Sequence, residues 1–143
     1  MAKKEFKYYP REEVNSIVEI AERAKRLYGD SVAYIYKEKK TRVEKTYIDL
    51  VADSKALAQL LMKQNLKKGH IALIGASSYR YIVSYYAAMF AGLVIVPLDK
   101  ELGFEDVYEQ MEKADVDFFL YDKTYRDYAK LVEEKTNGTM GMF

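Results

Sequence analysis

The sequence of 143 residues contains no cysteine, no tryptophan and a single histidine. The absence of cysteine excludes disulfide bonds, thiolate catalysis and metal sites with sulfur ligands. The one histidine, His70, has no aspartate, glutamate or second histidine at a ligand spacing, so we interpret it as a surface residue and not as an acid–base group. We predict no catalytic residue and no metal ligand in this chain.

The chain also lacks an excess of either charge and any long apolar run. Lysine and arginine total 23 against 22 aspartate and glutamate residues, a formal net charge of +1, so no long-range field attracts nucleic acid or an anionic membrane. No apolar stretch approaches the ~20 residues of a membrane span, and no apolar core of a signal peptide follows the basic start. We therefore expect a cytoplasmic protein with no nucleic-acid partner and no transmembrane segment.

Hydrophobic residues make up 50% of the chain and aromatic residues 14%, which excludes disorder over most of its length. A chain of this length suits one domain with a substantial core. We predict a flexible arm over residues 1–13, where no sustained period occurs, and an α/β domain over residues 14–136. Residues 137–143 have the composition of a flexible tail.

The first part of the predicted domain has the residue patterns of a helix and of a β-hairpin. Ser16 followed by Glu19 has the spacing of a capping box, and apolar residues then recur at helical spacing. Two strand-like stretches, 32–36 and 41–46, are joined by a charged turn. These signals predict a helix followed by a β-hairpin.

A second capping box, Thr46 with Asp49, predicts the start of a long amphipathic helix. After this helix, continuous apolar runs of buried-strand length alternate with segments of helical periodicity. The predicted strands are 71–75, 93–96 and 117–121, and the predicted helices are 79–91, 104–114 and 123–135. Because crossover helices join the buried strands, the strands should pair in parallel. The predicted class is α/β, three-layered, with a mostly parallel sheet flanked by helices and preceded by a helix and a β-hairpin.

Three short motifs occur in order along this framework. Lys45-Thr46-Tyr47-Ile48-Asp49-Leu50 comes first, residues 66–75 follow, and residues 90–99 contain Ala-Gly and then Val-Pro-Leu. At these separations the chain resembles the N-terminal part of AMP-forming acyl-CoA synthetases, most closely the long-chain fatty-acid–CoA ligase branch. The resemblance implies that residues 14–136 are a partial AMP-binding N-terminal domain. His70 departs from the pattern, since the family usually has an acidic residue there.

The resemblance also implies a chemistry. The family activates a carboxylate with ATP to an acyl-adenylate and then transfers the acyl group to CoA, using a Ser/Thr/Gly-rich loop ending in Lys-Gly, a magnesium-binding Glu and a late lysine. None of these can be placed here, so ATP, Mg and CoA are implied for a full-length parent and no cofactor for this chain, which we expect to be inactive alone. Residues 136–142 echo the phosphate loop without its Lys-Gly, and we favour chance or truncation as the explanation.

One segment remains as a candidate binding site. Residues 75–79 join a predicted strand to a predicted helix at the carboxyl edge of the sheet, where helix N-terminal amides often bind anions. Ser77 and Ser78 are its candidate cofactor-binding residues. Because the segment lacks the Gly-x-Gly-x-x-Gly and Lys-Ser/Thr patterns, we favour helix capping as the role of these serines.

The sequence therefore supports two functions. The first is an N-terminal fragment of an ATP-dependent acyl-CoA synthetase, and the alternative is a freestanding interaction or small-ligand-binding module on the same scaffold. The expected partner is the remainder of the synthetase or a second copy of the chain, with the tyrosine-rich helix from Tyr79 to Tyr86 or an edge strand at the contact of a homodimer. The acyl chain length, and whether the chain is short by nature, stay open.

Overall fold

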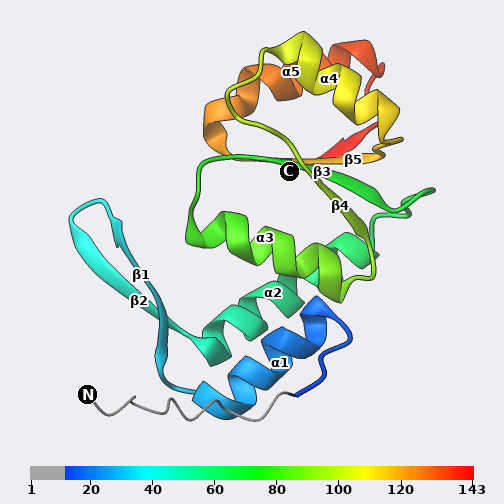
Figure 1. Cartoon of the computed structure of the whole chain (residues 1–143). Coiled ribbons are helices and arrows are strands. Elements are labelled where there is room, and N and C mark those ends of the chain that lie inside the picture. Colours follow the sequence, from blue (N-terminus) through cyan, green and yellow to red (C-terminus); the bar gives the residue numbers. More distant parts are fainter. Residues whose placement is uncertain (1–11) are drawn as a thin grey trace, which may run out of the picture.

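The computed structural model describes residues 12–143 (Figure 1). In chain order its elements are α1 (Ile17–Tyr28), β1 (Val32–Glu38), β2 (Thr41–Thr46), α2 (Tyr47–Met62), β3 (His70–Ile74), α3 (Tyr79–Phe90), β4 (Val94–Pro97), α4 (Phe104–Lys113), β5 (Phe118–Tyr121), the 3-10 turn η1 (Lys123–Tyr125), α5 (Arg126–Lys135) and β6 (Gly141–Met142). Most of the predicted arm, residues 1–11, lies outside the described residues.

The larger sheet has the strand order β4-β3-β5-β6, and all of its pairings are parallel. β3 lies between its neighbours, so that Ile71 is opposite both Ile95 of β4 and Phe118 of β5. The three strands predicted from the apolar runs pair as expected, and each connection between them passes through a helix. The α/β class with a parallel sheet is confirmed.

Helices cover both faces of this sheet, with α2 and α3 on one side and α4 and α5 on the other (Figure 1). Alternate residues of β3 point to opposite faces. Ile71 and Leu73 pack with residues of α2 and α3, whereas Ala72 and Ile74 pack with residues of α4 and α5. Because both faces of β3 are buried, its sequence is continuously apolar, and the three-layer arrangement follows.

The antiparallel hairpin β1–β2 and helix α1 lie on the α2 side of the molecule (Figure 1). Tyr34 and Tyr36 of β1 pack against the ring of Tyr79 on α3, with centroid separations of 5.6 and 5.7 Å. Tyr79 is buried, and the other tyrosines of α3 are half-buried. The helix that the sequence places at a homodimer contact is therefore largely covered by the chain itself. No helix in the described range has both the length and the apolar character needed to cross a membrane.

Both predicted N-terminal caps mark helix starts, but only the one at Thr46 is a complete capping box, since Glu19 accepts the amide of Asn15 and not that of Ser16. The Ser16 hydroxyl accepts the Glu19 amide at 3.0 Å. At α2 the exchange is reciprocal, since the Thr46 amide donates to Asp49 at 2.9 Å and the Asp49 amide donates to the Thr46 hydroxyl at 3.1 Å. These bonds from Thr46 hold the pKa of Asp49 below its ordinary value, so the carboxylate is charged at neutral pH.

The structure differs from the sequence prediction in residues 137–143, where no regular element was expected. Gly141–Met142 form β6, which pairs in parallel with Phe118 and Phe119 of β5. Gly141 permits this approach, because a Cβ at its position would lie 2.6 Å from the Phe118 ring. Two residues are too short to give a periodic signal, so this strand could not be recognised from the sequence.

Replacing Ala88 of α3 by aspartate should destabilise the fold severely. Ala88 is fully buried, and an unpaired carboxylate there costs several kcal/mol. Urea unfolding measures the loss. Arg80→Asp is the matched control, since the Arg80 side chain is 89% exposed on the same helix. An unchanged unfolding midpoint for Ala88→Asp would mean that this face of α3 is exposed.

Replacing Ser54 of α2 by alanine should stabilise the protein by about 1 kcal/mol, because an unpaired buried hydroxyl costs desolvation that alanine does not. Ser54 is fully buried, and its Oγ has no hydrogen-bond partner among residues 12–143. Thermal unfolding gives the comparison. A lower melting temperature for Ser54→Ala would show that the hydroxyl has a favourable contact.

Candidate functional site

The carboxyl ends of β3 and β5 border a crevice at the point where the strand order reverses. From β3 the chain passes through α3 to β4 on one side, and it then crosses to β5 on the other side. In open parallel sheets, ligands bind at such a switch point beyond the carboxyl ends of the strands. The topology therefore predicts a ligand-binding site at this crevice.

The crevice contains a hollow of about 560 Å³. Its apolar lining includes Leu73 of β3, Leu120 of β5 and Phe143. Its polar lining includes the side chains of Ser78, Ser84, Arg80, Lys123 and Thr124. An apolar interior with a few polar groups at the rim is the usual composition of a small-molecule site.

Asp122 ties together the two loops that border the crevice. Its carboxylate accepts the amide of Ala76 at 2.8 Å and the amide of Thr124 at 2.7 Å. Partial burial raises the pKa of Asp122, but these hydrogen bonds outweigh burial and hold the pKa below its ordinary value. Gly75 leaves room for the carboxylate, since a Cβ there would lie 3.2 Å from Asp122 Oδ2. Asp122 is thus a charged structural clamp.

The structure separates the roles of Ser77 and Ser78. Ser78 precedes α3, and its hydroxyl accepts the Tyr81 amide at 3.1 Å. This is the capping role that the sequence favoured. Ser77 is exposed and does not line the crevice. Cofactor binding by either serine stays a prediction.

A polar cluster next to the crevice joins the hairpin to the helices. Asp53 of α2 accepts both Lys45 Nζ at 3.0 Å and the Tyr79 hydroxyl at 2.8 Å. Burial and the bond to Asp53 raise the pKa of Tyr79, so its hydroxyl stays protonated. The ammonium of Lys45 also lies 5.3 Å from the centre of the Tyr79 ring. Sequence reasoning missed this cluster, because only the folded hairpin brings the three residues together.

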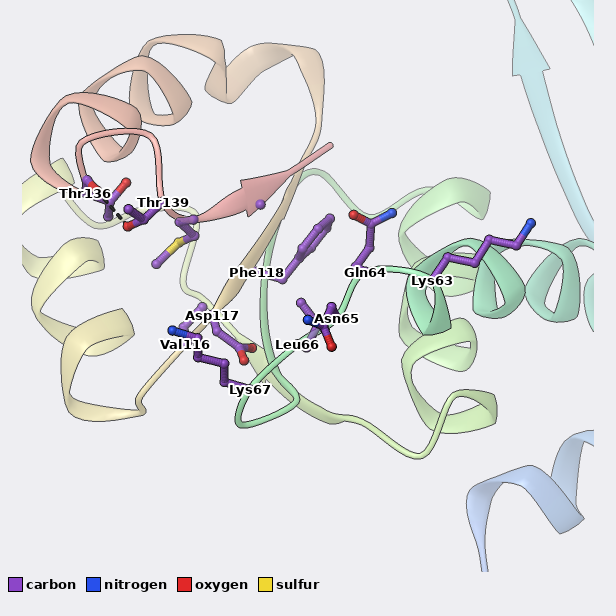
Figure 2. Close-up of a pocket in the computed structure, with 12 residues that line it drawn as sticks. Lys63, Gln64, Asn65, Leu66, Lys67, Val116, Asp117, Phe118, Thr136 and Thr139 are labelled. Carbon is purple, nitrogen blue, oxygen red and sulfur yellow. Dashed lines mark hydrogen bonds between the residues drawn. The ribbon is translucent and has the colours of Figure 1, made fainter.

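A second hollow of about 530 Å³ lies at the opposite, amino edge of the sheet. In Figure 2, Thr136 and Thr139 lie across from Lys63 and Gln64, with Phe118 between them. The acid at this edge is Asp117, whose carboxylate accepts three consecutive backbone amides, those of residues 68–70, at 2.7 to 3.2 Å. Its acceptor sites are therefore occupied by the turn before β3.

His70 also has a structural partner at this edge. Its side chain is half-buried, and Nδ1 lies 2.6 Å from the carbonyl of Ala114, so this nitrogen carries the proton and donates. The side chain is thus less exposed than the sequence suggested. The hydrogen bond fixes the ring on the loop after α4.

The first residues of the segment 136–141, Thr136 to Gly138, form the C-terminal cap of α5. The Gly138 amide donates to the Glu133 carbonyl at 2.9 Å, and the Asn137 amide donates to the Glu134 carbonyl at 3.3 Å. Asn137 and Gly138 both have positive φ, 50° and 70°. This is the Schellman arrangement. Because a helix C-terminus carries partial negative charge, this end repels phosphate and does not fit the role of a phosphate loop.

The residues that line the crevice have the composition of a binding site and include no catalytic pair. Arg80 and Lys123 are cations, Asp122 is occupied by amides, and the Ser78 hydroxyl caps α3. Residues 12–143 also contain no group of three or more His, Cys, Asp or Glu side chains arranged to hold a metal ion. The geometry of the described residues supports ligand binding and scaffolding.

Asp122→Asn should lower the free energy of unfolding at pH 7 by about 1–2 kcal/mol, because it weakens charge-assisted bonds to two amides. The lowered pKa means that this contribution is full above the ordinary aspartate pKa and is lost as the pH falls through the folded-state pKa. Unfolding curves of the two proteins should therefore converge below about pH 4. A constant difference between pH 3 and pH 7 would contradict the charge-based explanation.

Solved structures share this fold over most of the chain. The N-terminal subdomain of NpsA from Klebsiella oxytoca, in complex with 3-hydroxybenzoyl-AMSN, is 23% identical with a TM-score of 0.68, covering 77% of this chain and 27% of that one. O-succinylbenzoate coenzyme A synthetase from Bacillus subtilis, in complex with AMP, is 20% identical with a TM-score of 0.70, and the match covers 86% of this chain and 30% of that one. A protein named as a long-chain-fatty-acid CoA ligase from Rhodopseudomonas palustris is 18% identical with a TM-score of 0.76, and the match covers 90% of this chain and 32% of that one. At these identities the similarity establishes the fold.

The chain spans less than a third of the length of each of these structures. Nonribosomal peptide synthetase 5 from Gibberella zeae is 35% identical over 85 residues, which are 59% of this chain and 1% of that protein. The sequence signature of AMP-binding enzymes matches residues 20–141, which is most of the chain, and the protein therefore belongs to the AMP-binding enzyme family.

Proposed function

We propose that this chain is the N-terminal α/β segment of an ATP-dependent acyl-CoA synthetase. The observation that carries the proposal is the family match over residues 20–141. The fold supports it as well, because synthetases of CoA esters contain the same arrangement of strands and helices in a chain about three times longer. In such an enzyme the carboxylate is first activated as an acyl-adenylate and then transferred to CoA.

The role of this segment is to form part of the scaffold on which the remaining chain completes the active site. Its prominent polar residues are engaged in structure, as Asp117 and Asp122 show by binding backbone amides. In the Thr- and Gly-rich segment 136–141, the first three residues cap the C-terminus of α5, and a helix C-terminus does not fit the phosphates of ATP. ATP, Mg and CoA thus belong to the parent enzyme, and the cytoplasm is a compartment that suits a chain without cysteine.

The long-chain branch is the proposed substrate class. It is supported by Asp99-Lys100-Glu101-Leu102, which extends the Val-Pro-Leu motif in the style of that branch. A structure in complex with 3-hydroxybenzoyl-AMSN has the same fold, and a nonribosomal peptide synthetase is similar in sequence. The choice between fatty and aromatic acids therefore rests on the motif alone.

Purified chain should release no pyrophosphate from ATP with any carboxylic acid. No lysine that binds phosphate and no carboxylate that binds magnesium can be assigned in this sequence, and the electrostatic stabilisation that such residues supply is a large part of catalysis. ATP–pyrophosphate exchange with octanoate, palmitate and benzoate measures the activity. Exchange that depends on the acid and is abolished by a point mutation in this chain would refute inactivity.

Mixing the chain with a separately expressed C-terminal part of a related synthetase tests the scaffold role. Stoichiometric association with recovered exchange supports the proposal. Ala88→Asp is the control, because a chain that cannot fold should recover nothing. Association without recovered exchange would show that the two parts bind each other but do not complete an active site.

The alternative is a small-ligand-binding module, and the 560 Å³ hollow at the carboxyl ends of β3 and β5 favours it. In this case the chain alone should bind an amphipathic carboxylate, with its carboxylate near Arg80 and Lys123. Titration of octanoate followed by NMR distinguishes the two functions. Saturable shifts confined to the crevice and weakened in Arg80→Ala, a change at an exposed residue, would favour the module.

A further inference from the structure

The sequence contains a single Asn-Gly pair, Asn137-Gly138, at the end of α5. In such a pair the backbone nitrogen of glycine readily attacks the side-chain amide of asparagine, because glycine has no Cβ to hinder the approach. Asn137 is exposed, so water has access to its side chain. The other asparagines, Asn15 and Asn65, precede serine and leucine. Asn137 is therefore the asparagine most prone to spontaneous deamidation.

Deamidation of this pair needs no reactant other than water. The Gly138 nitrogen forms a bond to Cγ of Asn137, the bond from Cγ to Nδ2 breaks, and ammonia leaves with the proton from Gly138. The resulting succinimide ring then takes up water at one of its two carbonyl groups. Opening on one side gives aspartate, and opening on the other gives isoaspartate, whose main chain is longer by one carbon. Both products carry a carboxylate in place of the neutral amide.

The C-terminal cap of α5 holds the pair in a geometry that opposes ring closure. The Gly138 amide donates to the Glu133 carbonyl at 2.9 Å, so the attacking nitrogen keeps its proton. Asn137 and Gly138 have φ values of 50° and 70°, and this fixed backbone prevents the nitrogen from turning toward the side chain. Ring closure also builds negative charge, which the partial negative charge of a helix C-terminus disfavours. The cap must therefore open before Asn137 can react.

Strand β6 and a threonine bond keep the cap closed. The Thr139 hydroxyl donates to the Thr136 carbonyl at 2.7 Å, as the dashed line in Figure 2 shows. The backbone of Phe143 makes two hydrogen bonds with β5, at 3.0 and 3.1 Å. Only Thr139 and Met140 connect the cap to β6, so the strand anchors the cap through a very short link.

We propose that Asn137 is a modification site whose reaction is gated by β6. Deamidation proceeds while β6 is detached from β5 and the cap is open, and the product then prevents the strand from returning. A carboxylate at position 137 is repelled by the helix C-terminus, and the longer main chain of isoaspartate does not fit the short link to β6. The modified chain keeps β5 as an exposed edge. This inference does not depend on the proposed ligase role.

Tryptic peptide mapping measures the reaction, because cleavage after Lys135 releases residues 136–143 as one peptide. The full chain is incubated in buffer and in urea at the same neutral pH, and the ratio of the two deamidation rates gives the protection by the fold. We expect a protection of about ten-fold or more, since a local opening must precede the reaction. The peptides with Asn15 and Asn65 should stay unmodified over the same time. Equal rates in buffer and in urea would overturn the proposal.

A substitution in β6 tests the gate without changing the reacting pair. In Gly141→Ala the new Cβ would lie 2.6 Å from the buried Phe118 ring, so β6 should detach and the protection should fall by about five-fold or more, the effect of at least one lost hydrogen bond. Gly103→Ser is the matched control, because it adds a Cβ where no atom lies within 4 Å, and it should keep the full protection.

Thr139→Val provides a second variant in case circular dichroism shows that Gly141→Ala does not fold. It removes the hydroxyl bond to the Thr136 carbonyl at an exposed position, and it should also lower the protection by about five-fold. Each rate in buffer is divided by the rate of the same variant in urea, which removes any effect of sequence on the chemistry. Protection that is unchanged in the folded variants would overturn the gate.

The fate of the product is tested on chain that has already been deamidated and separated by ion exchange. Hydrogen exchange of the Phe143 amide, which donates to the Phe119 carbonyl at 3.1 Å, reports whether β6 is paired. The isoaspartate form should exchange this amide about ten-fold faster than unmodified chain. An unchanged exchange rate would show that β6 returns after modification and would overturn this part of the proposal.

Discussion

The pairing of β3 with β5 is the contact on which the rest of this fold depends, and an aspartate closes it at each end. Asp117, directly before β5, binds the amides of residues 68–70 that lead into β3. Asp122, directly after β5, binds the amide of Ala76 that follows β3. Four backbone donors that the parallel ladder leaves unpaired are thereby satisfied, and the two strands are held in register from Ile71–Phe118 to Ile74–Tyr121. Both hollows of the sheet lie beside these clamps.

The sequence predicted the parts of the fold that depend on local signals. Buried strands were recognised from their continuous apolar runs. Ser16 and Thr46 marked helix starts, because the hydroxyl of a cap and the amide that it accepts are only three residues apart in the sequence. The two aspartate clamps were missed, since their partners lie 46 to 49 residues away in sequence. For a similar reason the cluster of Lys45, Asp53 and Tyr79 gave no motif. Contacts that arise from topology have no fixed spacing along the chain.

The candidate site was partly accessible to sequence reasoning. Its position followed from the alternation of strands and helices, because parallel strands place their carboxyl ends at one edge. Its chemistry did not follow. Ser78 and Tyr81 use their hydrogen bond to begin α3, and Asp122 uses its carboxylate to join two loops. Polar residues at a sheet edge must first satisfy backbone groups, and only those left over are available to a ligand. At this crevice the remaining charged groups are Lys123 and Arg80, and the Arg80 guanidinium also pairs with Glu38 at 3.3 Å.

The segment 136–142 shows that threonine and glycine residues have different roles at the two ends of a helix. Threonine and glycine residues bind phosphate when their amides point outward at the beginning of a helix, where the dipole is positive. Here the same residue types follow the last turn of α5, and their amides turn inward to the carbonyls of Glu133 and Glu134. Asn137 and Gly138 adopt the left-handed conformation that ends the helix. The chain then enters β6, where Gly141 packs under Phe118. The segment thus completes the edge of the sheet, and an anion-binding role would require this cap to unwind first.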